Sequence, residues 1–393
     1  MTIPAADSTG KARPMNNPTA TSLRRVRLRL PGLANFSAIY LWLIFLVLFG
    51  SLQGHLFLSG STFQLVFAQN SVMAVLALAF LMPLVTDTFD LSIGEMMSLT
   101  IVLMNYLAIH TKLPTLVVIP LLIVVGGVVG LVNGLVVIKL RINSLIATLG
   151  MSELLQAAQL RLSGNQQVSA VFPSSFVKAG NGDIFGIPYL TIYLLVIAVI
   201  MWFVLEQMPL GRRMMAVGGN RDASKLAGIK SNRIVWGSLV TSGAVAAVAG
   251  IMYTMQVGAY TSDIGSQYLF PALAAVFFGA SQLSQRPNVW GTLLAFFALA
   301  FGIQGLTLQF GAGTFWVNPL FQGVALILAV GVASTRGAIG KGRDGQAVQR
   351  VLRRRGAAAE PAEPAAANPP GAPTAASAAP GRSSDRVRVE RSS

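Results

Sequence analysis

The sequence contains the run Leu116-Val-Val-Ile-Pro-Leu-Leu-Ile-Val-Val-Gly-Gly-Val-Val-Gly-Leu-Val-Asn-Gly-Leu-Val-Val-Ile138, which carries no charged residue. A helix of about 20 apolar residues spans the hydrocarbon core of a bilayer. Further apolar runs lie at 41–49, 65–85 and 190–205. The whole chain is 53% hydrophobic and 11% charged, against roughly 25% charged residues in soluble domains. The sequence therefore predicts an all-α, polytopic integral membrane protein.

Polar and Gly/Pro-containing breaks divide the chain into about ten predicted transmembrane helices. Their predicted ranges are 36–54, 63–86, 92–111, 114–138, 143–162, 188–205, 234–254, 268–283, 289–310 and 314–334. The short range 268–283 is either a span or a re-entrant segment. With an even number of spans and the amino terminus inside, most loop arginines and lysines fall on the inside, as the positive-inside rule requires. We therefore expect both termini to be cytoplasmic.

The net charge of +15 is concentrated in the two tails, with +5 in residues 1–35, +6 in residues 336–393 and only +4 between them. Positive-inside signals and attraction to anionic lipid explain this distribution better than nucleic-acid binding does. Residues 1–35 are predicted to be a basic cytoplasmic segment. The Ala/Pro/Arg-rich range 336–393 is predicted to be a disordered cytoplasmic tail. A transmembrane domain then occupies 36–335, with a cytoplasmic loop at 206–233.

A polar stretch, Pro209 to Lys230, separates two apolar runs and has the features of a short helix. Asn220 can cap its start, Asp222 lies in its first turn, and Gly228 can adopt the left-handed conformation at its end. We expect Gly218 and Gly219, just before the helix, to provide backbone angles that other residues adopt poorly.

Ala223, Leu226 and Ala227 are predicted to share one face of this short helix. A helix of one to two turns is unstable alone, so this face needs a partner surface. The stretch is therefore interpreted as a docking surface, although an ordinary amphipathic loop between two membrane helices is the alternative.

Several polar residues are predicted at or near membrane depth, where such groups usually face a bundle interior or an aqueous path. Asp90 can cap the helix that follows it, with Ser92 and Glu95 in the first turn; a role in a solute path is the alternative. Asn133 lies on a helix face formed by glycines, where it either bonds across helices or lines a path. That face predicts close helix packing and comprises Gly126, Gly127, Gly130 and Gly134.

Catalytic patterns are absent from the sequence. The two histidines, His55 and His110, have no neighbouring metal ligands, and the chain has no cysteine, which excludes disulfides and thiolate metal sites. The phosphate-binding pattern Gly-x-x-x-x-Gly-Lys-Ser/Thr does not occur. We therefore expect no metal site, no bound cofactor and no ATPase site in this chain, so that any motor is a separate polypeptide.

Three blocks make the chain resemble the permease subunits of bacterial ABC importers for ribose, xylose, galactose and related sugars. They are Asp90-Leu-Ser-Ile-Gly94, Asn133-Gly-Leu-Val-Val-Ile-Lys-Leu-Arg-Ile-Asn-Ser-Leu-Ile-Ala-Thr-Leu-Gly-Met151, and the block running from Gly211-Arg through Gly218-Gly-Asn to Leu226-Ala-Gly-Ile229. The resemblance covers about residues 60–334. It implies an inner-membrane location, a second permease copy or relative, a partner subunit that hydrolyses ATP, and a periplasmic or lipid-anchored solute-binding protein.

The resemblance also implies roles for individual residues. The third block resembles the coupling loop that contacts the ATPase subunit; its candidate coupling residues are Gly211, Arg212, Gly218, Gly219, Asn220, Ala223, Leu226 and Gly228. The candidate path residues are Asp90, Ser92, Asn133, Asn143 and Thr148.

The chain departs from the family pattern at two places. Family members usually carry Gly-Gly-Ile before Asp-Leu-Ser, where this chain has Asp87-Thr-Phe. A Gly-rich Ser-Leu-Ser-Gly-Gly turn is expected where residues 281–288 stand. Both departures lie beside the expected path or the ATPase contact.

The resulting hypothesis is a permease subunit that moves a small polar solute inward, a sugar or polyol, by alternating access driven by the separate ATPase. The alternative from another class is a stand-alone proton- or sodium-coupled transporter, with Asp87, Asp90 and Glu95 as ion-linked carboxylates. A membrane-embedded enzyme would require a convergent polar site that the sequence does not display.

Overall fold

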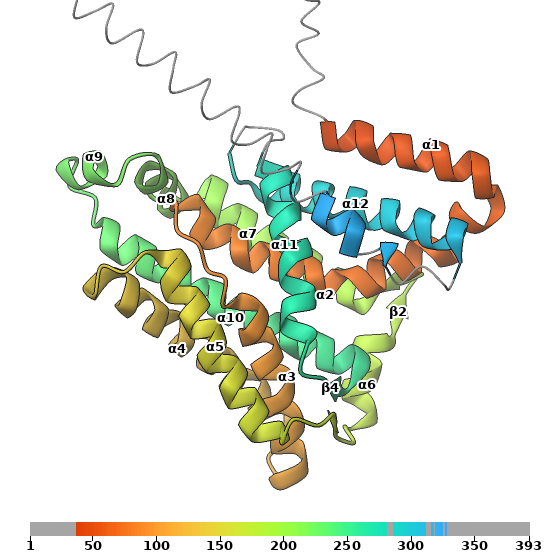
Figure 1. The fold of residues 1–393 in the computed structure, drawn as a ribbon, viewed down its shortest axis with the longest axis horizontal. Coiled ribbons are helices and arrows are strands. Elements are labelled where there is room, and N and C mark those ends of the chain that lie inside the picture. Colours follow the sequence, from red (N-terminus) through yellow and green to blue (C-terminus); the bar gives the residue numbers. More distant parts are fainter. Residues whose placement is uncertain (1–36, 281–285, 312–315, 318, 325–326, 328–393) are drawn as a thin grey trace, which may run out of the picture. The chain divides into compact units, whose positions relative to one another are not determined.

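The computed structural model describes residues 37–280, 286–311, 316–317, 319–324 and 327. Helices form most of this part of the chain, as the sequence predicts (Figure 1). Their bounds are α1 (Ser37–Phe57), α2 (Gly60–Val85), α3 (Ile93–His110), α4 (Thr115–Lys139), α5 (Ser144–Ser163), α6 (Ser174–Asn181), α7 (Tyr189–Trp202), α8 (Pro209–Gly219), α9 (Arg221–Leu226), α10 (Ser231–Val257), α11 (Ile264–Ala280) and α12 (Val289–Phe310). A π-helical turn, η1 (Phe203–Gln207), continues α7.

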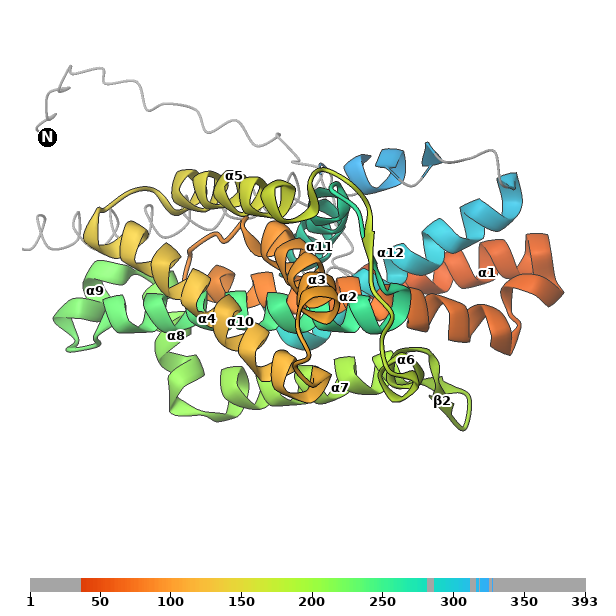
Figure 2. The ribbon, with the colours of Figure 1, turned by 90° about the horizontal axis from the view of Figure 1, so that it is seen from below.

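Two short antiparallel strand pairs complete the described elements. β1 (Val168–Ser169) pairs with β4 (Ala259–Tyr260), and β2 (Asp183–Ile184) pairs with β3 (Ile187–Pro188). In Figures 1 and 2, β2 and α6 lie at the opposite end of the bundle from α8 and α9. This separation agrees with the predicted topology, in which α8 and α9 belong to an inside loop and α6 to an outside one.

Seven helices in the described part of the chain are long and apolar enough to cross a membrane. They are α1, α2, α3, α4, α7 extended by η1, α10 and α12. The predicted span at 268–283 corresponds to α11, a shorter apolar helix of 17 residues. α5 has 20 residues but is more polar, with Glu153, Gln156 and Arg161 along it. The predicted range 314–334 falls largely outside the described residues, so ten spans and cytoplasmic termini stay predictions, as do the segments 1–35 and 336–393.

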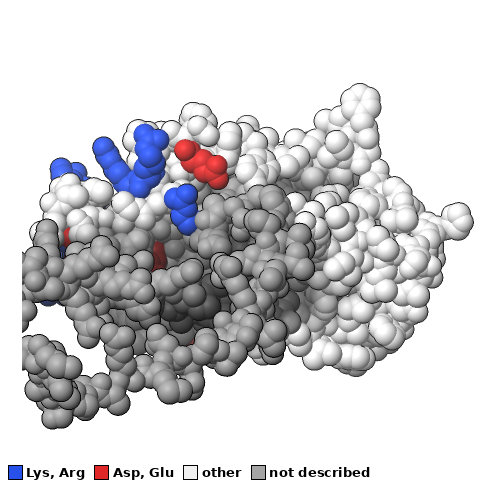
Figure 3. All heavy atoms as spheres, turned by 90° about the horizontal axis from the view of Figure 1, so that it is seen from above, with Lys and Arg blue, Asp and Glu red and all other residues white. Residues whose placement is uncertain are grey.

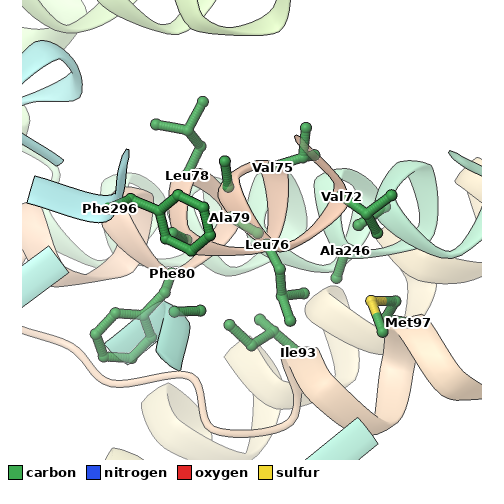
Figure 4. Close-up of a cluster of buried hydrophobic side chains, with 14 of the residues drawn as sticks. Val72, Val75, Leu76, Leu78, Ala79, Phe80, Ile93, Met97, Ala246 and Phe296 are labelled. Carbon is green, nitrogen blue, oxygen red and sulfur yellow. The ribbon is translucent and has the colours of Figure 1, made fainter. Parts of the chain in front are cut away.

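The second half of α2, from Val72 to Val85, lies at the centre of the bundle because its sequence is apolar on every side, which is typical of a fully buried helix. α2 packs against α7, α10, α11 and α12. Eight consecutive residues, Ala74–Leu81, are completely buried. Figure 4 shows Leu76 and Phe80 of α2 among side chains of α3, α10 and α12, including Ile93, Ala246 and Phe296. The central core therefore joins the helices that carry the polar residues described below.

The glycine face predicted on α4 packs directly against α10. A Cβ atom added to Gly126 would overlap the carbonyl oxygen of Gly243, and one added to Gly130 would overlap that of Leu239. Gly134 lies against the indole of Trp236 in the same way. Small residues allow two helix backbones to approach this closely. The predicted close helix packing is confirmed, and we call this contact the glycine seam.

Candidate functional site

The short helix predicted within the polar stretch is α9, and both of its predicted ends are confirmed. The Asn220 side-chain oxygen accepts hydrogen bonds from the backbone N–H groups of Asp222 (3.1 Å) and Ala223 (2.9 Å). Gly228 follows the helix with φ +80°, a conformation that glycine adopts without strain. Lys225 donates a 2.9 Å hydrogen bond to Asp222, and this bond and the lysine charge lower the pKa of the Asp222 carboxyl.

α9 presents an apolar face to the surroundings. Ala223, Leu226 and Ala227 are exposed, and Leu226 is 92% exposed, whereas Ser224 on the other side is buried against the protein. An isoleucine next to the helix, Ile229, packs on the bundle. We call the exposed face formed by Ala223, Leu226 and Ala227 the docking surface. Exposed leucine on a helix this short has no stabilising role within the chain, which favours contact with a partner.

The expectation for Gly218 and Gly219 is wrong. Both residues belong to α8, and neither has a positive φ. Gly218 is required for a different reason: a Cβ atom there would overlap the carbonyl oxygen of Val85 and lie 3.3 Å from the backbone nitrogen of Asp87. Gly219 faces open space, since a Cβ atom added to it would have no other atom within 4 Å. Gly211, at the other end of α8, approaches the carbonyl group of Leu205.

The connecting segment 86–92 joins α2 to α3 and is held by several helices. Thr86 shares a 3.2 Å hydrogen bond with Ser238 of α10. The Phe89 N–H donates to Ser144 (3.2 Å), and the Leu91 N–H donates to Thr148 (3.1 Å), both on α5. Since Gly218 of α8 touches the start of the same segment, helices α5, α8 and α10 all contact it directly.

Asp87 adopts a left-handed backbone conformation, with φ +54°. This is the position where the resembling family usually has glycine, and glycine takes such an angle without a Cβ penalty. Aspartate is among the residues that tolerate it best. The departure from the family pattern therefore leaves the backbone path of the segment intact.

Three of the candidate path residues, Asp90, Ser92 and Asn133, form one buried polar cluster. The Asp90 Oδ1 atom accepts hydrogen bonds from the Ser92 N–H (3.1 Å), the Ser92 hydroxyl (2.6 Å) and the Asn133 amide (3.4 Å). The Asn133 amide also donates to the Ser92 hydroxyl at 2.8 Å. The expected capping role of Asp90 is wrong: Ser92 is the N-cap residue of α3 and lies outside its first turn, and Asp90 bonds Ser92 instead of an N–H group within the helix.

The other two candidate path residues occupy different surroundings. Thr148 is buried and bonds Leu91 of the connecting segment, so it lies beside the polar cluster. Asn143 is exposed and caps α5, where its side-chain oxygen accepts a 2.9 Å hydrogen bond from the Leu145 N–H. The structure therefore brings Thr148 to the cluster and leaves Asn143 outside it.

A second buried polar group was not predicted and centres on Gln159 of α5. Its amide nitrogen donates to the Glu95 carboxylate (2.9 Å), while its oxygen accepts from Ser98 (2.5 Å) and Tyr260 (3.3 Å). The spacing of Thr148, Ser152 and Gln159 places three polar side chains on one face of a helix, and this pattern could have indicated the group.

The first cluster keeps hydrogen-bonding capacity that the described residues do not use. Asn133 Oδ1 is buried without a hydrogen-bond partner in that part of the chain, and Ser242 lies close enough to the Asp90 carboxylate to interact with it. Buried polar atoms normally have partners, and exceptions call for an explanation such as a bound water or a functional role. No group of residues within the described ranges has the composition of a metal site.

Comparison with known proteins gives a consistent result. The family model described as branched-chain amino acid transport system / permease component matches residues 63–330. The chain is similar to the ribose import permease protein RbsC of Haemophilus influenzae, with 27% identity over 75% of this chain and 90% of the relative. It is 28% identical to RbsC of Escherichia coli K12 over 73% of this chain and 90% of the relative. The autoinducer 2 import system permease protein LsrD of Salmonella typhimurium is 27% identical over 65% and 78% of the two chains. No solved structure matches.

Proposed function

The chain belongs to the branched-chain amino acid transport system / permease component family, and from this we propose that it forms the translocation path of an ATP-driven importer for a small polar solute, a sugar or polyol. It is a multi-pass membrane protein and a permease subunit. The solute class is inferred from its relatives, which are named as import permeases for ribose or autoinducer 2. Because RbsC and LsrD are both import permeases, we do not retain the ion-driven alternative.

The docking surface on α9 is the observation that supports this function most directly. It is apolar, exposed and carried by a helix whose two ends are fixed by Asn220 and Gly228. The sequence holds no phosphate-binding loop pattern, and we infer that a separate ATPase subunit supplies the energy for transport. We infer that the ATPase subunit receives the docking surface, in the manner of an amphipathic helix lying in a groove.

We further propose that movement of α9 reaches the polar cluster through α8 and the connecting segment 86–92. Only Asn220 separates the end of α8 from the start of α9. Gly218 places the end of α8 directly on the backbone of Val85 and Asp87. The same segment carries Asp90 and Ser92. A displacement of α8 would therefore act on residues that bond Asn133 and α5, and would open one side of the path and close the other.

The exposed residues on the outer face of α5 support the proposal that a second permease copy forms the other wall of the path. Leu149 and Leu154 are exposed, and Glu153 lies exposed between them. An exposed carboxylate in the middle of a helix packed within a membrane bundle requires water or protein around it, since lipid cannot solvate it. We propose that α5 of two copies, identical or related, enclose a hydrated path, and that a solute-binding protein delivers the solute at the end of the bundle where α6 and β2 lie.

The test is purification of the tagged full-length chain in a gentle detergent, with identification of co-purifying proteins and an ATPase assay. Gly219→Trp should remove the ATPase and abolish uptake without affecting membrane insertion, because the position faces open space. Gly60→Trp is the matched control. A Cβ atom added to Gly60 also has no other atom within 4 Å, and Gly60 begins α2 at the end of that helix opposite to Val85. An active preparation without any ATPase, or normal uptake by Gly219→Trp, would overturn the proposal.

A further inference from the structure

A cavity of about 300 Å³ lies where α7 ends and α8 begins, close to the start of α12. Leu205 and Asn288 are buried and Met215 is half-buried, so together they line its inner part. The charged residues Glu206, Arg212 and Arg286 line it as well and are exposed. The cavity thus combines a mostly apolar interior with two positive groups and one negative group at its opening.

The π-helical turn η1 places Glu206 at this cavity. A π-turn adds one residue to a helical turn and is frequent at functional sites. The Glu206 carboxylate accepts a 3.0 Å hydrogen bond from the indole N–H of Trp202. This bond fixes the position of the carboxylate and uses only one of its acceptor sites.

The two arginines keep their charge available for a ligand. Arg286 donates to the sulfur of Met215 at 3.5 Å, and its own carbonyl accepts a 2.8 Å hydrogen bond from Asn288. Within the described ranges, an ion pair forms between Lys225 and Asp222 on α9 and involves none of the cavity residues. Arg212, Arg286 and Glu206 therefore have no ion-pair partner in that part of the chain.

The cavity lies at the level where a membrane boundary is expected. The apolar helix α7 ends immediately before it, and the rings of Trp202 and Trp290 lie 6.4 Å apart beside it. Tryptophan is enriched at the headgroup level of membranes. Figure 3 shows basic and acidic side chains gathered toward one end of the visible face, while the visible surface at its other end is uncharged.

We propose that this cavity binds the headgroup of a zwitterionic aminophospholipid. Guanidinium groups bind phosphate through paired hydrogen bonds, so Arg212 and Arg286 would hold the lipid phosphate. A primary ammonium group can donate hydrogen bonds to the Glu206 carboxylate. A headgroup with only negative charge would be repelled by Glu206, and a quaternary ammonium has no N–H to donate. The acyl chains would then lie along the exposed apolar surface of α7. Lipid binding goes beyond the proposed transport function, although the cavity shares Arg212 with the candidate coupling residues, so the assay measures lipid binding in the absence of transport.

The experiment is native mass spectrometry of the purified full-length chain, incubated with equal amounts of phosphatidylethanolamine, phosphatidylcholine and phosphatidylglycerol. We expect the wild type to retain phosphatidylethanolamine in preference to the other two lipids. Glu206→Gln should remove the preference over phosphatidylcholine, because the amide keeps the bond from Trp202 but loses the charge. Arg286→Gln should lower retention of every phospholipid by about fivefold, the size expected for one exposed ion pair. Arg213→Gln is the control, since Arg213 is a neighbouring exposed arginine that does not line the cavity.

Three results would overturn the proposal. The first is equal retention of the three lipids by the wild type. The second is displacement of the lipid by millimolar inorganic phosphate, which would indicate a site for free phosphate. The third is loss of the lipid when the ATPase subunit is bound, which would identify the cavity as part of a protein contact. Each variant removes a different predicted contact and lies at an exposed position, so failure of one to fold leaves the other as a test.

Discussion

Replacement of Gly218 by alanine tests whether α8 transmits movement to the connecting segment 86–92. The added Cβ atom would lie 3.1 Å from the carbonyl carbon of Val85, 3.3 Å from the nitrogen of Asp87 and closer still to the Val85 oxygen. Real Cβ atoms essentially never approach another atom within 3.0 Å. All three neighbours are backbone atoms and cannot rotate away, so α8 has to move off the segment. Such overpacking typically costs about 1–3 kcal/mol.

The displaced α8 should weaken the link between ATP hydrolysis and transport. A cost of about 1.4 kcal/mol, which lies within that range, corresponds to about a tenfold change in an equilibrium between two conformations. We therefore expect Gly218→Ala to reduce solute uptake per ATP hydrolysed by about tenfold. The assay is parallel measurement of uptake and phosphate release in proteoliposomes that contain the complete importer. Thermal unfolding of the purified variant separates this effect from a general loss of stability.

Gly219→Ala is the matched control for this experiment. It adds the same methyl group to the adjacent helical residue, where the structure has nothing within 4 Å. We expect it to transport like the wild type. If Gly218→Ala also keeps the wild-type ratio of uptake to hydrolysis, then α8 does not act through Val85 and Asp87, and the proposed route from the docking surface to the polar cluster is refuted.

Three further predictions concern packing, capping and assembly. Gly126→Ala should destabilise the protein by about 1–3 kcal/mol in thermal unfolding, because its Cβ atom collides with the Gly243 backbone, whereas Gly127→Ala should not, since the nearest atom to a Cβ there is 3.8 Å away. Asn220→Ala should cost α9 about 1 kcal/mol and lower recovery of the ATPase in co-purification, while the aspartate variant retains it. Gly150→Cys on the outer face of α5 should form a disulfide between two copies upon mild oxidation. The chain has no cysteine of its own, so any disulfide would involve this position. Absence of a cross-linked dimer on a gel would contradict the proposed interface.

Features that depend on neighbouring residues could be predicted from the sequence. The cap at Asn220 and the glycine turn at Gly228 each involve a few consecutive residues, and sequence patterns indicate such bonds directly. The glycine face of α4 was predictable because helical periodicity gathers residues at spacings of three and four on one side. Its partner on α10 was not predictable, since helical periodicity does not indicate which other helix packs against this face.

Features that depend on distant parts of the chain were missed or misread. Gly218 has ordinary helical angles, and its requirement comes from Val85, which is more than 130 residues earlier in the sequence. Gln159 likewise gathers Ser98 and Tyr260 from elements that are far apart in sequence. Glycine and glutamine carry no local sign of such contacts, because a side chain or backbone atom from elsewhere fills the space beside them only after the chain has folded.

The glycine seam also limits which helices can move separately. Backbones that touch at Gly126 and Gly130 cannot slide without collision, so α4 and α10 travel as one rigid body. That body includes Asn133, and it is tethered to α9 by the four residues 227–230. Gly250 brings α10 equally close to the backbone of Met97 in α3, so α3 belongs to the same closely packed unit. The 2.8 Å hydrogen bond from Asn133 to Ser92 lies within this unit and ties the end of the connecting segment 86–92 to it, so a displacement of that segment has to act on the three helices together.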